Sequence, residues 1–142
     1  MTHVRHLLAN KKSSLFTIGP DAPVLEAVRS MAEHGVGALL VMSAGELAGI
    51  VSERDYARKV VLHGRASADT PVAQIMSSPV ITVAPETTVQ HCMVLMTERR
   101  FRHLPVVEAG RVIGVVSIGD LVKSVIEEQQ RTIEQLETYI HG

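Results

Sequence analysis

Several residue types are scarce in this sequence, and each scarcity excludes a class of protein. Aromatic residues make up 3% of the chain and tryptophan is absent, which is too few for the aromatic platforms that bind single-stranded nucleic acid. The formal net charge is −1, so no excess of either sign attracts duplex DNA or an anionic membrane. We therefore expect neither nucleic acid nor membrane among the partners.

Cysteine and long hydrophobic runs are also scarce. The single cysteine, Cys92, rules out an intramolecular disulfide and fits a reducing compartment. No apolar run approaches the ~18 residues of a membrane span, and the opening MTHVRHLLANKK has no signal-peptide core or cleavage site. These features predict a soluble, cytoplasmic protein.

The sequence contains an internal repeat. GIVSERD at Gly49–Asp55 returns as GVVSIGD at Gly114–Asp120, and aligning the two phrases also aligns Thr17–Asp55 with Thr82–Asp120 without a gap. The chain therefore consists of two copies of one unit. The identical pairs include Thr17/Thr82, Pro20/Pro85, Val24/Val89, Met31/Met96, Leu39/Leu104, Val41/Val106, Gly45/Gly110, Ser52/Ser117 and Asp55/Asp120.

Each copy predicts the order β-α-β-β-α. In the first copy a short strand ends at Ile18, a helix begins near Val24, and Gly35 and Gly37 end that helix. The apolar run ALLVM and the segment LAGIVS then form a hairpin across the turn SAGE, where we expect a positive φ at Gly45. ERDYARKVVLH forms the closing helix. The second copy repeats the order with VITV, a helix over Val89–Glu98, HLPVVE, the turn AGRV, VIGVVS and a helix from Gly119.

The predicted fold class is α+β (α/β), with two β-α-β-β-α repeats and additional helices at the N- and C-termini. Each repeat has a sheet face to bury and too little helix to cover it, so we expect the repeats to pack sheet to sheet with pseudo-twofold symmetry. Such packing creates two clefts, each lined by a strand-to-helix junction. We divide the chain into a first repeat with its N-terminal helix (1–65), a second repeat (66–125) and a C-terminal helical extension (126–142).

The two copies resemble a pair of cystathionine-β-synthase-type (CBS) domains, also called a Bateman module. The resemblance rests on TIGPDAPVLEAVRSM…GALLVM…GELAGIVSERD and TVAPETTVQHCMVLM…FRHLPVVE…GRVIGVVSIGD, and it extends over roughly Val4–Val125. It implies a stand-alone regulatory module, not an enzyme, that binds an adenosine-containing ligand and dimerises. AMP is the first candidate ligand, with ADP, ATP, NAD and S-adenosylmethionine as alternatives.

The residues at the repeated junctions suit such a ligand. A carboxylate accepts hydrogen bonds from both hydroxyls of a ribose diol, and we expect this role for Asp55 and Asp120. Phosphate binds backbone N–H groups at a helix start and guanidinium groups. The residues at two such helix starts are Ser52, Arg54, Ser117 and Gly119. The apolar side chains expected to pack on adenine are Ile18, Val36, Val83 and Phe101.

Carried over from the resemblance, the family pattern gives two unequal sites. The cleft of Asp120 takes Ser117, Gly119, Arg102 and His103 from the second repeat, and Ala22, Ala27, Val36 and Gly37 from the first. The cleft of Asp55 takes Ser52, Arg54 and Ala38 from the first repeat, and Thr87, Cys92, Phe101 and Arg102 from the second. Where the second repeat has Arg102–His103, the first has Gly37–Ala38, although Arg54, at the position of the uncharged Gly119, can supply a cation in the first site. We therefore expect the two sites to differ in phosphate preference.

Structural roles are an alternative for most of these residues. Ser-x-x-Asp after an apolar run is also a capping box, so Asp55 and Asp120 can act as helix caps alone. Arg102 can belong to a solvated basic patch, and His103 can be a packed strand residue. We interpret Cys92 as a small core residue of a helix. We expect no metal site, because no set of three ligands is evident.

Both ends of the chain predict further helices. HVRHLLANKK and VAQIM each form a short helix that leads into a repeat. A helix from Leu121 to Ile140 would be about 30 Å long, which is longer than a closing helix needs, and its apolar stripe favours contact with a second copy in a homodimer. The residues of that stripe are Val122, Val125, Ile126, Ile133, Leu136 and Ile140.

Two functions of different kinds follow. The first is a regulatory module that senses an adenine nucleotide and signals to a partner protein. The alternative is a structural dimeric adaptor whose clefts are vestigial and bind no ligand. An enzyme ranks third, because the sequence has no Ser-His-Asp order, metal triad or carboxylate pair. Asp and Ser at both junctions, with Arg nearby, favour the sensor over the adaptor.

Overall fold

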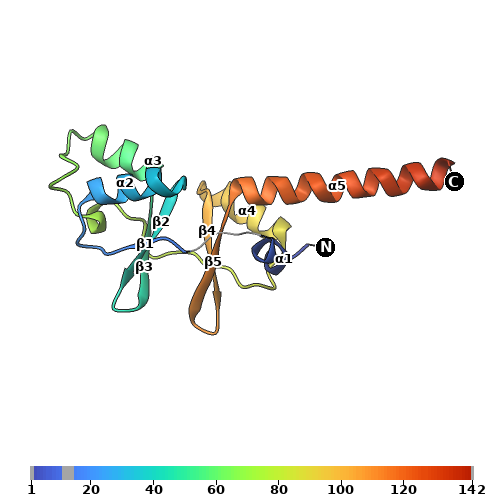
Figure 1. Ribbon diagram of the computed structural model, residues 1–142, viewed down its shortest axis with the longest axis horizontal. Coiled ribbons are helices and arrows are strands. Elements are labelled where there is room, and N and C mark those ends of the chain that lie inside the picture. Colours follow the sequence, from blue (N-terminus) through green and yellow to red (C-terminus); the bar gives the residue numbers. More distant parts are fainter. Residues whose placement is uncertain (1, 11–14, 142) are drawn as a thin grey trace. The chain divides into compact units, whose positions relative to one another are not determined.

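The computed structural model describes residues 2–10 and 15–141 (Figure 1), and these residues form two compact units. Residues 15–81 form one unit, which we call the repeat-1 unit. Residues 2–10 and 82–141 together form the other, the repeat-2 unit. No helix of the described residues has the length and apolar character needed to cross a membrane.

The repeat-1 unit has a three-stranded sheet with helices packed on it. Strand β2 pairs with β1 in parallel and with β3 in antiparallel orientation. Its buried core joins residues of α2, β2 and β3 to Val60, Val72 and Ile75. The elements are β1 (Thr17–Ile18), α2 (Val24–His34), β2 (Ala38–Ser43), β3 (Glu46–Ser52), α3 (Glu53–Tyr56), a π-helical turn (Ala57–Val61) and a 3₁₀ turn (Val72–Gln74).

Local sequence explains where these elements begin and end. Helix α2 ends at Gly35, whose φ of 64° is in the left-handed region that glycine adopts without strain. The hairpin turns at Ala44 and Gly45, with φ values of 52° and 79°, and positive φ at both central residues matches the twist of the flanking strands. The positive φ predicted for Gly45 is confirmed.

The repeat-2 unit has the same order of elements and one difference in its sheet. The elements are α1 (Val4–Ala9), α4 (Val89–Arg99), β4 (His103–Glu108), β5 (Arg111–Ser117) and α5 (Ile118–His141). VITV was predicted to form a strand, but among the described residues this segment makes only an isolated parallel bridge between Val83 and Val106. In the repeat-1 unit the Leu40 amide donates to Phe16 O at 3.1 Å; the equivalent residue, Pro105, has no N–H, so the ladder is one bond shorter.

The two units do not follow the order of the repeats along the chain. Helix α1 precedes the first repeat but packs in the repeat-2 unit, where the Val4 amide donates to Thr87 O and the Arg5 amide to Pro85 O, both at 2.9 Å. The 3₁₀ turn before the second repeat packs in the repeat-1 unit through equivalent bonds: the amides of Val72 and Ala73 donate to Ala22 O and Pro20 O, both at 2.9 Å. Each short helix therefore leads into one repeat and docks in the unit of the other.

The first glycine of each repeated Gly-x-x-Ser-x-x-Asp segment, Gly49 or Gly114, leaves space for the segment that docks there. A Cβ on Gly49 would lie 2.7 Å from Met76 Sδ and 2.9 Å from Ser77 O, and a Cβ on Gly114 would lie 2.5 Å from Leu8 Cδ2. All three distances are shorter than real Cβ contacts. At Gly49 the close neighbours include the backbone oxygen of Ser77, so a side chain there would displace the segment around Met76; at Gly114 a side chain would displace the Leu8 side chain.

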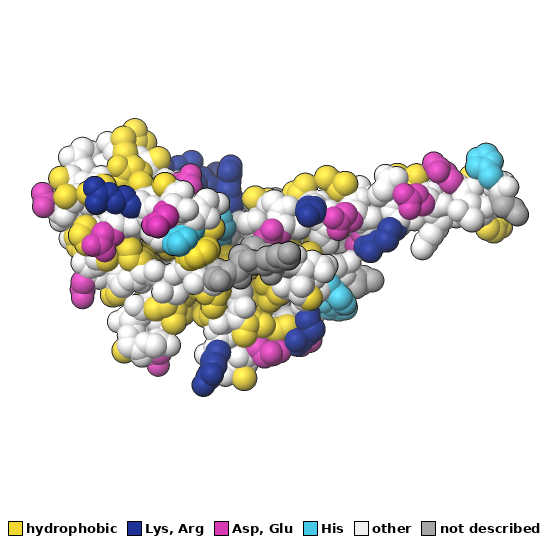
Figure 2. All heavy atoms as spheres, viewed as in Figure 1, with side chains coloured by type: hydrophobic (Ala, Val, Ile, Leu, Met, Phe, Trp, Pro, Cys, Tyr) yellow, Lys and Arg dark blue, Asp and Glu magenta, His cyan; other side chains and the backbone are white. Residues whose placement is uncertain are grey.

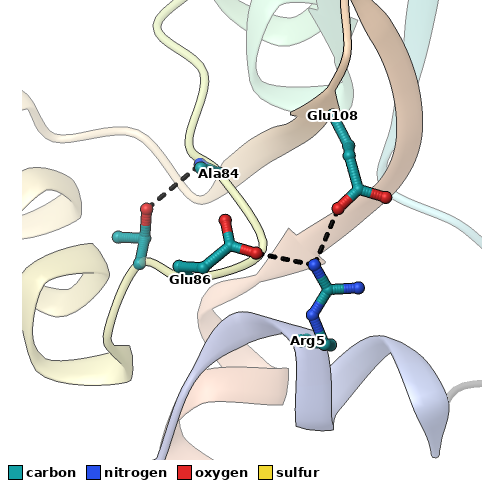
Figure 3. Close-up of polar contacts among 5 residues, drawn as sticks. Arg5, Ala84, Glu86 and Glu108 are labelled. Carbon is teal, nitrogen blue, oxygen red and sulfur yellow. Dashed lines mark hydrogen bonds and ion pairs between the residues drawn. The ribbon is translucent and has the colours of Figure 1, made fainter.

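Helix α1 is also held by an ion-pair network on the surface of the repeat-2 unit (Figure 3). Arg5 Nη2 donates to Glu86 Oε1 at 2.6 Å and to Glu108 Oε2 at 2.7 Å. The Arg5 hydrogen bond lowers the pKa of the Glu86 carboxyl, and the two carboxylates raise the pKa of Arg5. One arginine thus connects α1 to the loop before α4 and to the end of β4.

Candidate functional site: two Ser-x-x-Asp junctions

The first junction lies where β3 meets α3 in the repeat-1 unit. The amide and Oγ of Ser52 donate to Asp55 Oδ2 at 2.9 and 3.0 Å, and the Asp55 amide donates to Ser52 Oγ at 3.1 Å. This is a complete capping box. The capping role considered from the sequence is therefore real, and it fixes the carboxylate at the start of a helix.

Lys59 occupies the other oxygen of the same carboxylate. Its ammonium lies 3.1 Å from Asp55 Oδ1 and donates to Ile75 O at 2.9 Å. The Asp55 side chain is only 13% exposed, whereas that of Lys59 is 43% exposed. Sequence reasoning missed Lys59, although its i,i+4 spacing from Asp55 is the spacing at which opposite charges meet on a helix.

The second junction lies where β5 meets α5 in the repeat-2 unit. The Ser117 amide donates to Asp120 Oδ2 at 2.8 Å, and the Asp120 amide donates to Ser117 Oγ at 3.2 Å. The reciprocal serine–aspartate bonds of the capping box at the first junction are thus also present at the second. The repeat equivalent of Lys59 is Ser124, which is 5% exposed and carries no charge. The two junctions therefore differ at the position four residues after the aspartate, which is a lysine in the first and a serine in the second.

In each unit the predicted phosphate-facing pair lies beside the junction. Ala38 pairs with Ser52 across the hairpin, and the Glu53 amide donates to Gly37 O at 3.0 Å. In the repeat-2 unit His103 pairs with Ser117, and the Ile118 amide donates to Arg102 O at 2.9 Å. The two pairs are therefore structurally equivalent, and only the second places an arginine and a histidine on the backbone segment beside its junction.

The remaining predicted residues divide between the two units. Thr87 accepts a hydrogen bond from the Ala84 amide on its Oγ1 at 3.0 Å, so its hydroxyl orders the loop before α4. Ala22 accepts from the Val72 amide at 2.9 Å. Cys92 is fully buried, and burial raises the pKa of its thiol to about 11, as for a core residue. The repeat-1 unit holds Ile18, Ala22, Ala27, Val36, Gly37, Ala38, Ser52, Arg54 and Asp55. The repeat-2 unit holds Val83, Thr87, Cys92, Phe101, Arg102, His103, Ser117, Gly119 and Asp120.

Known proteins identify the family of this arrangement. The CBS domain family matches residues 4–62 and 72–127. The mitochondrial CBS domain-containing protein CBSX3 of Arabidopsis thaliana is 48% identical over 127 residues, which cover 86% of this chain and 62% of that protein. The CBS domain-containing protein YhcV of Bacillus subtilis is 33% identical over 105 residues, which cover 74% of each chain.

Solved structures agree with the sequence relatives. The structure of a protein with CBS domains from Burkholderia ambifaria MC40-6 superposes with a TM-score of 0.87 at 50% identity, covering 90% of this chain and 96% of that one. The doubled β-hairpin, the doubled Ser-x-x-Asp junction and these matches agree on one conclusion. This chain belongs to the CBS domain family, and its two repeats are a pair of CBS domains, a regulatory module.

Proposed function

We propose that this chain is a ligand-sensing regulatory protein that binds an adenosine-containing nucleotide and reports it to a partner protein. AMP is the first candidate, with ADP, ATP and NAD as alternatives. The identity of the ligand comes from the family resemblance and from the chemistry of the junctions. Asp accepts from a ribose diol, and helix-start amides with a nearby guanidinium suit a phosphate.

The observation that carries the proposal is the grouping at the second junction. Asp120, fixed by the amide of Ser117 at 2.8 Å, starts a helix directly beside Arg102 and His103, which are continuous with the paired strand. A carboxylate and a guanidinium on adjacent backbone segments offer one acceptor for hydroxyl groups and one donor for phosphate. This combination supports nucleotide binding more strongly than a helix cap alone, because a cap needs no cation nearby.

The two junctions are not expected to bind equally well. Asp55 already accepts an ammonium from Lys59 at 3.1 Å, and a ribose hydroxyl would have to compete with that charged donor. Arg102 lies on the backbone segment beside the Asp120 junction, and the equivalent residue at the Asp55 junction is Gly37. Because a guanidinium binds phosphate, we assign the tighter site for a phosphate-bearing ligand to the Asp120 junction and a weaker one to the Asp55 junction.

A matched pair of substitutions tests the proposal. Asp120→Asn and Asp55→Asn each remove one capping carboxylate, and Asp55→Asn also removes the carboxylate partner of Lys59. Only Asp120→Asn should weaken AMP binding strongly, by roughly ten- to a hundredfold, because a charged acceptor for two hydroxyl groups is lost. Titration calorimetry measures the affinity, and thermal unfolding without ligand measures the cost to the cap. Saturation of the unsubstituted protein at about a hundred times Kd should raise its stability by about 2.7 kcal/mol.

Two results would contradict this assignment. If AMP, ADP, ATP, NAD and S-adenosylmethionine all give neither heat nor a thermal shift, the proposed adenosine-ligand binding is wrong and the structural adaptor is favoured. If Asp55→Asn weakens AMP more than Asp120→Asn does, the tighter site is at the first junction. Titration of Arg102→Ala with adenosine and with AMP adds a further comparison. Relative to the unsubstituted protein, this variant should bind AMP more weakly and adenosine equally well.

A further inference from the structure

The C-terminal half of α5 has no packing partner within the described part of the chain. The helix runs over 24 residues, Ile118–His141, and in Figure 1 it is the long helix that ends at the C-terminus. Its buried residues, Leu121 and Ser124, lie in its first two turns, and every described residue from 129 onward is exposed. The exposed stretch, residues 129–141, is short enough to be only marginally stable as an isolated helix in water, so a second surface is expected to cover it.

The exposed side of α5 carries a seven-residue hydrophobic repeat. Ile126, Ile133 and Ile140 occur at intervals of one heptad and are 59%, 48% and 73% exposed. Val122 and Leu136, which are 41% and 56% exposed, stand four residues before two of them. These are the a and d positions of a coiled-coil seam, and Figure 2 shows exposed hydrophobic side chains in yellow along this helix. The one polar seam residue is Gln129.

The residues beside the seam determine which way a partner helix must run. One flank, the e positions, carries Lys123, Gln130 and Glu137. Lys123 and Glu137 are about 21 Å apart along one helix at 1.5 Å per residue, so they cannot pair within one chain. The other flank, the g positions, is uncharged, with Val125, Thr132 and Tyr139.

Only an antiparallel partner makes these charges complementary. In a parallel pair the e positions face g positions, so Glu137 would meet a threonine and Lys123 an apolar residue. In an antiparallel pair e faces e, so Lys123 of each chain meets Glu137 of the other, and Gln130 meets its own copy. The same alignment places Ile126 opposite Leu136 and Val122 opposite Ile140. The charges at the e positions of one helix are therefore complementary to the same charges on a second copy that runs in the opposite direction.

We propose that α5 forms an antiparallel two-helix seam with α5 of a second copy of this chain, centred near Arg131. The overlap runs from Val122 to Ile140, about 28 Å along the helix axis. Leu121 and Ser124, which pack within the repeat-2 unit, stay on a different side of the helix from the seam. Gln129 opposite Ile133 makes this seam weaker than a wholly apolar one.

Disulfide trapping tests both the partner and the direction. In the antiparallel seam position 126 lies next to position 136 of the other copy, whereas two copies of position 126 are about 15 Å apart along the axis. Ile126→Cys and Leu136→Cys should each give little cross-linked dimer alone, and mixing the two variants, or combining them in one chain, should give it under mild oxidation. The native Cys92 is fully buried and does not compete. Efficient cross-linking of Ile126→Cys with itself would mean a parallel pair, and no cross-linking in any combination would mean that α5 does not self-associate; either result overturns the proposal.

Charge reversal provides an independent readout in the full-length protein. Lys123→Glu or Glu137→Lys alone places like charges together twice in a symmetric pair and should raise the Kd of the α5 pair at least about tenfold. The double variant Lys123→Glu with Glu137→Lys should restore it, as followed by the yield of the 126–136 cross-link at low salt. Glu127→Lys is the matched control, because it changes the charge equally outside both flanks. If the double variant stays as weak as the singles, the partner of this face is a different protein and the self-association is wrong.

Discussion

At the scale of single residues, Asp55 and Asp120 show how one motif can have two environments. Both carboxylates accept a hydrogen bond from the amide of the serine three residues earlier, at 2.9 and 2.8 Å. The difference lies four residues further on, where Lys59 holds Asp55 Oδ1 at 3.1 Å and Ser124 takes the equivalent place in the repeat-2 unit. The sequence predicted one role for both acids in two otherwise unequal sites, and the structure adds the contact of Lys59 with Asp55 as a difference that was not predicted.

Removal of Lys59 should take away the ammonium that contacts Asp55 at the first junction. Lys59→Met keeps the apolar stem and removes the ammonium, so Asp55 Oδ1 becomes available to a ribose hydroxyl. The ion pair is partly exposed and its loss should cost only roughly 0.5–1 kcal/mol of stability. Calorimetry should then show AMP binding at a second site, or a weak second site becoming tighter. This prediction depends on the proposed nucleotide binding.

Arg58→Met is the matched control, because Arg58 is an exposed neighbour that carries the same charge. Lys59→Met could leave the AMP stoichiometry and both affinities unchanged while Asp120→Asn still weakens binding. That result would mean that the Lys59 ammonium does not cause the difference between the two junctions, and that another feature of the repeat-1 unit does.

At the scale of helices and strands, α1 is held in the repeat-2 unit by backbone bonds, by Leu8 against Gly114 and by the Arg5 network. The network adds a pH dependence whose direction follows from Glu86. Its pKa is lowered in the folded state, chiefly by the hydrogen bond from Arg5. The contribution to stability is therefore complete above the pKa of the unfolded chain, about 4.3, and is lost as the pH falls through the lower folded value.

Glu86→Gln should accordingly destabilise the protein at neutral pH and have little effect at pH 3. Thermal unfolding of both proteins between pH 3 and 7 should give melting curves that converge as the carboxyl is protonated. Because both partners are largely exposed, with side-chain exposures of 54% and 70%, the difference at pH 7 should also shrink in high salt. A difference that is the same at pH 3 and pH 7 would mean that the substitution acts through the loop and not through the charge.

Most of these elements could be predicted from the sequence, and the exceptions have physical causes. Helical spacing, the glycine at Gly35 and the hairpin turns located α2, β2 and β3 because each signal is local. The strand expected at VITV was wrong because its partner at position 105 is a proline, and a missing ladder bond shows only when both strands are considered together. The length of α5 was predicted well, since its apolar stripe continues past the repeat. The docking of α1 was not predicted, because no local pattern specifies a contact with residues some eighty positions away.

At the scale of the whole molecule, each short helix packs in the unit of the repeat that it does not lead into, which we call the exchange of helices. Val4 is fully buried, and so are Val72 and Ile75 in the corresponding segment of the other unit. Each repeat therefore depends for part of its core on a segment that lies next to the other repeat in sequence. The repeat-2 unit is built from two separate stretches of chain, residues 2–10 and 82–141, so its core is incomplete without the segment that precedes the first repeat.

Truncation at the N-terminus should therefore weaken the distant repeat and leave the adjacent one intact. Deleting residues 1–10 uncovers the part of the repeat-2 core that Val4 fills, and loss of one such valine costs about 1.5–3 kcal/mol. The thiol of Cys92, fully buried in that unit with a pKa raised to about 11, should then react with a thiol reagent at pH 8 roughly ten- to a hundredfold faster, because local opening is easier. The control moves the thiol to the equivalent buried place in the repeat-1 unit with Ala27→Cys and Cys92→Ala, where the same deletion should hardly change the rate. Faster labelling at position 27 and an unchanged rate at Cys92 would mean that α1 stabilises the repeat it precedes, and the exchange of helices would be wrong.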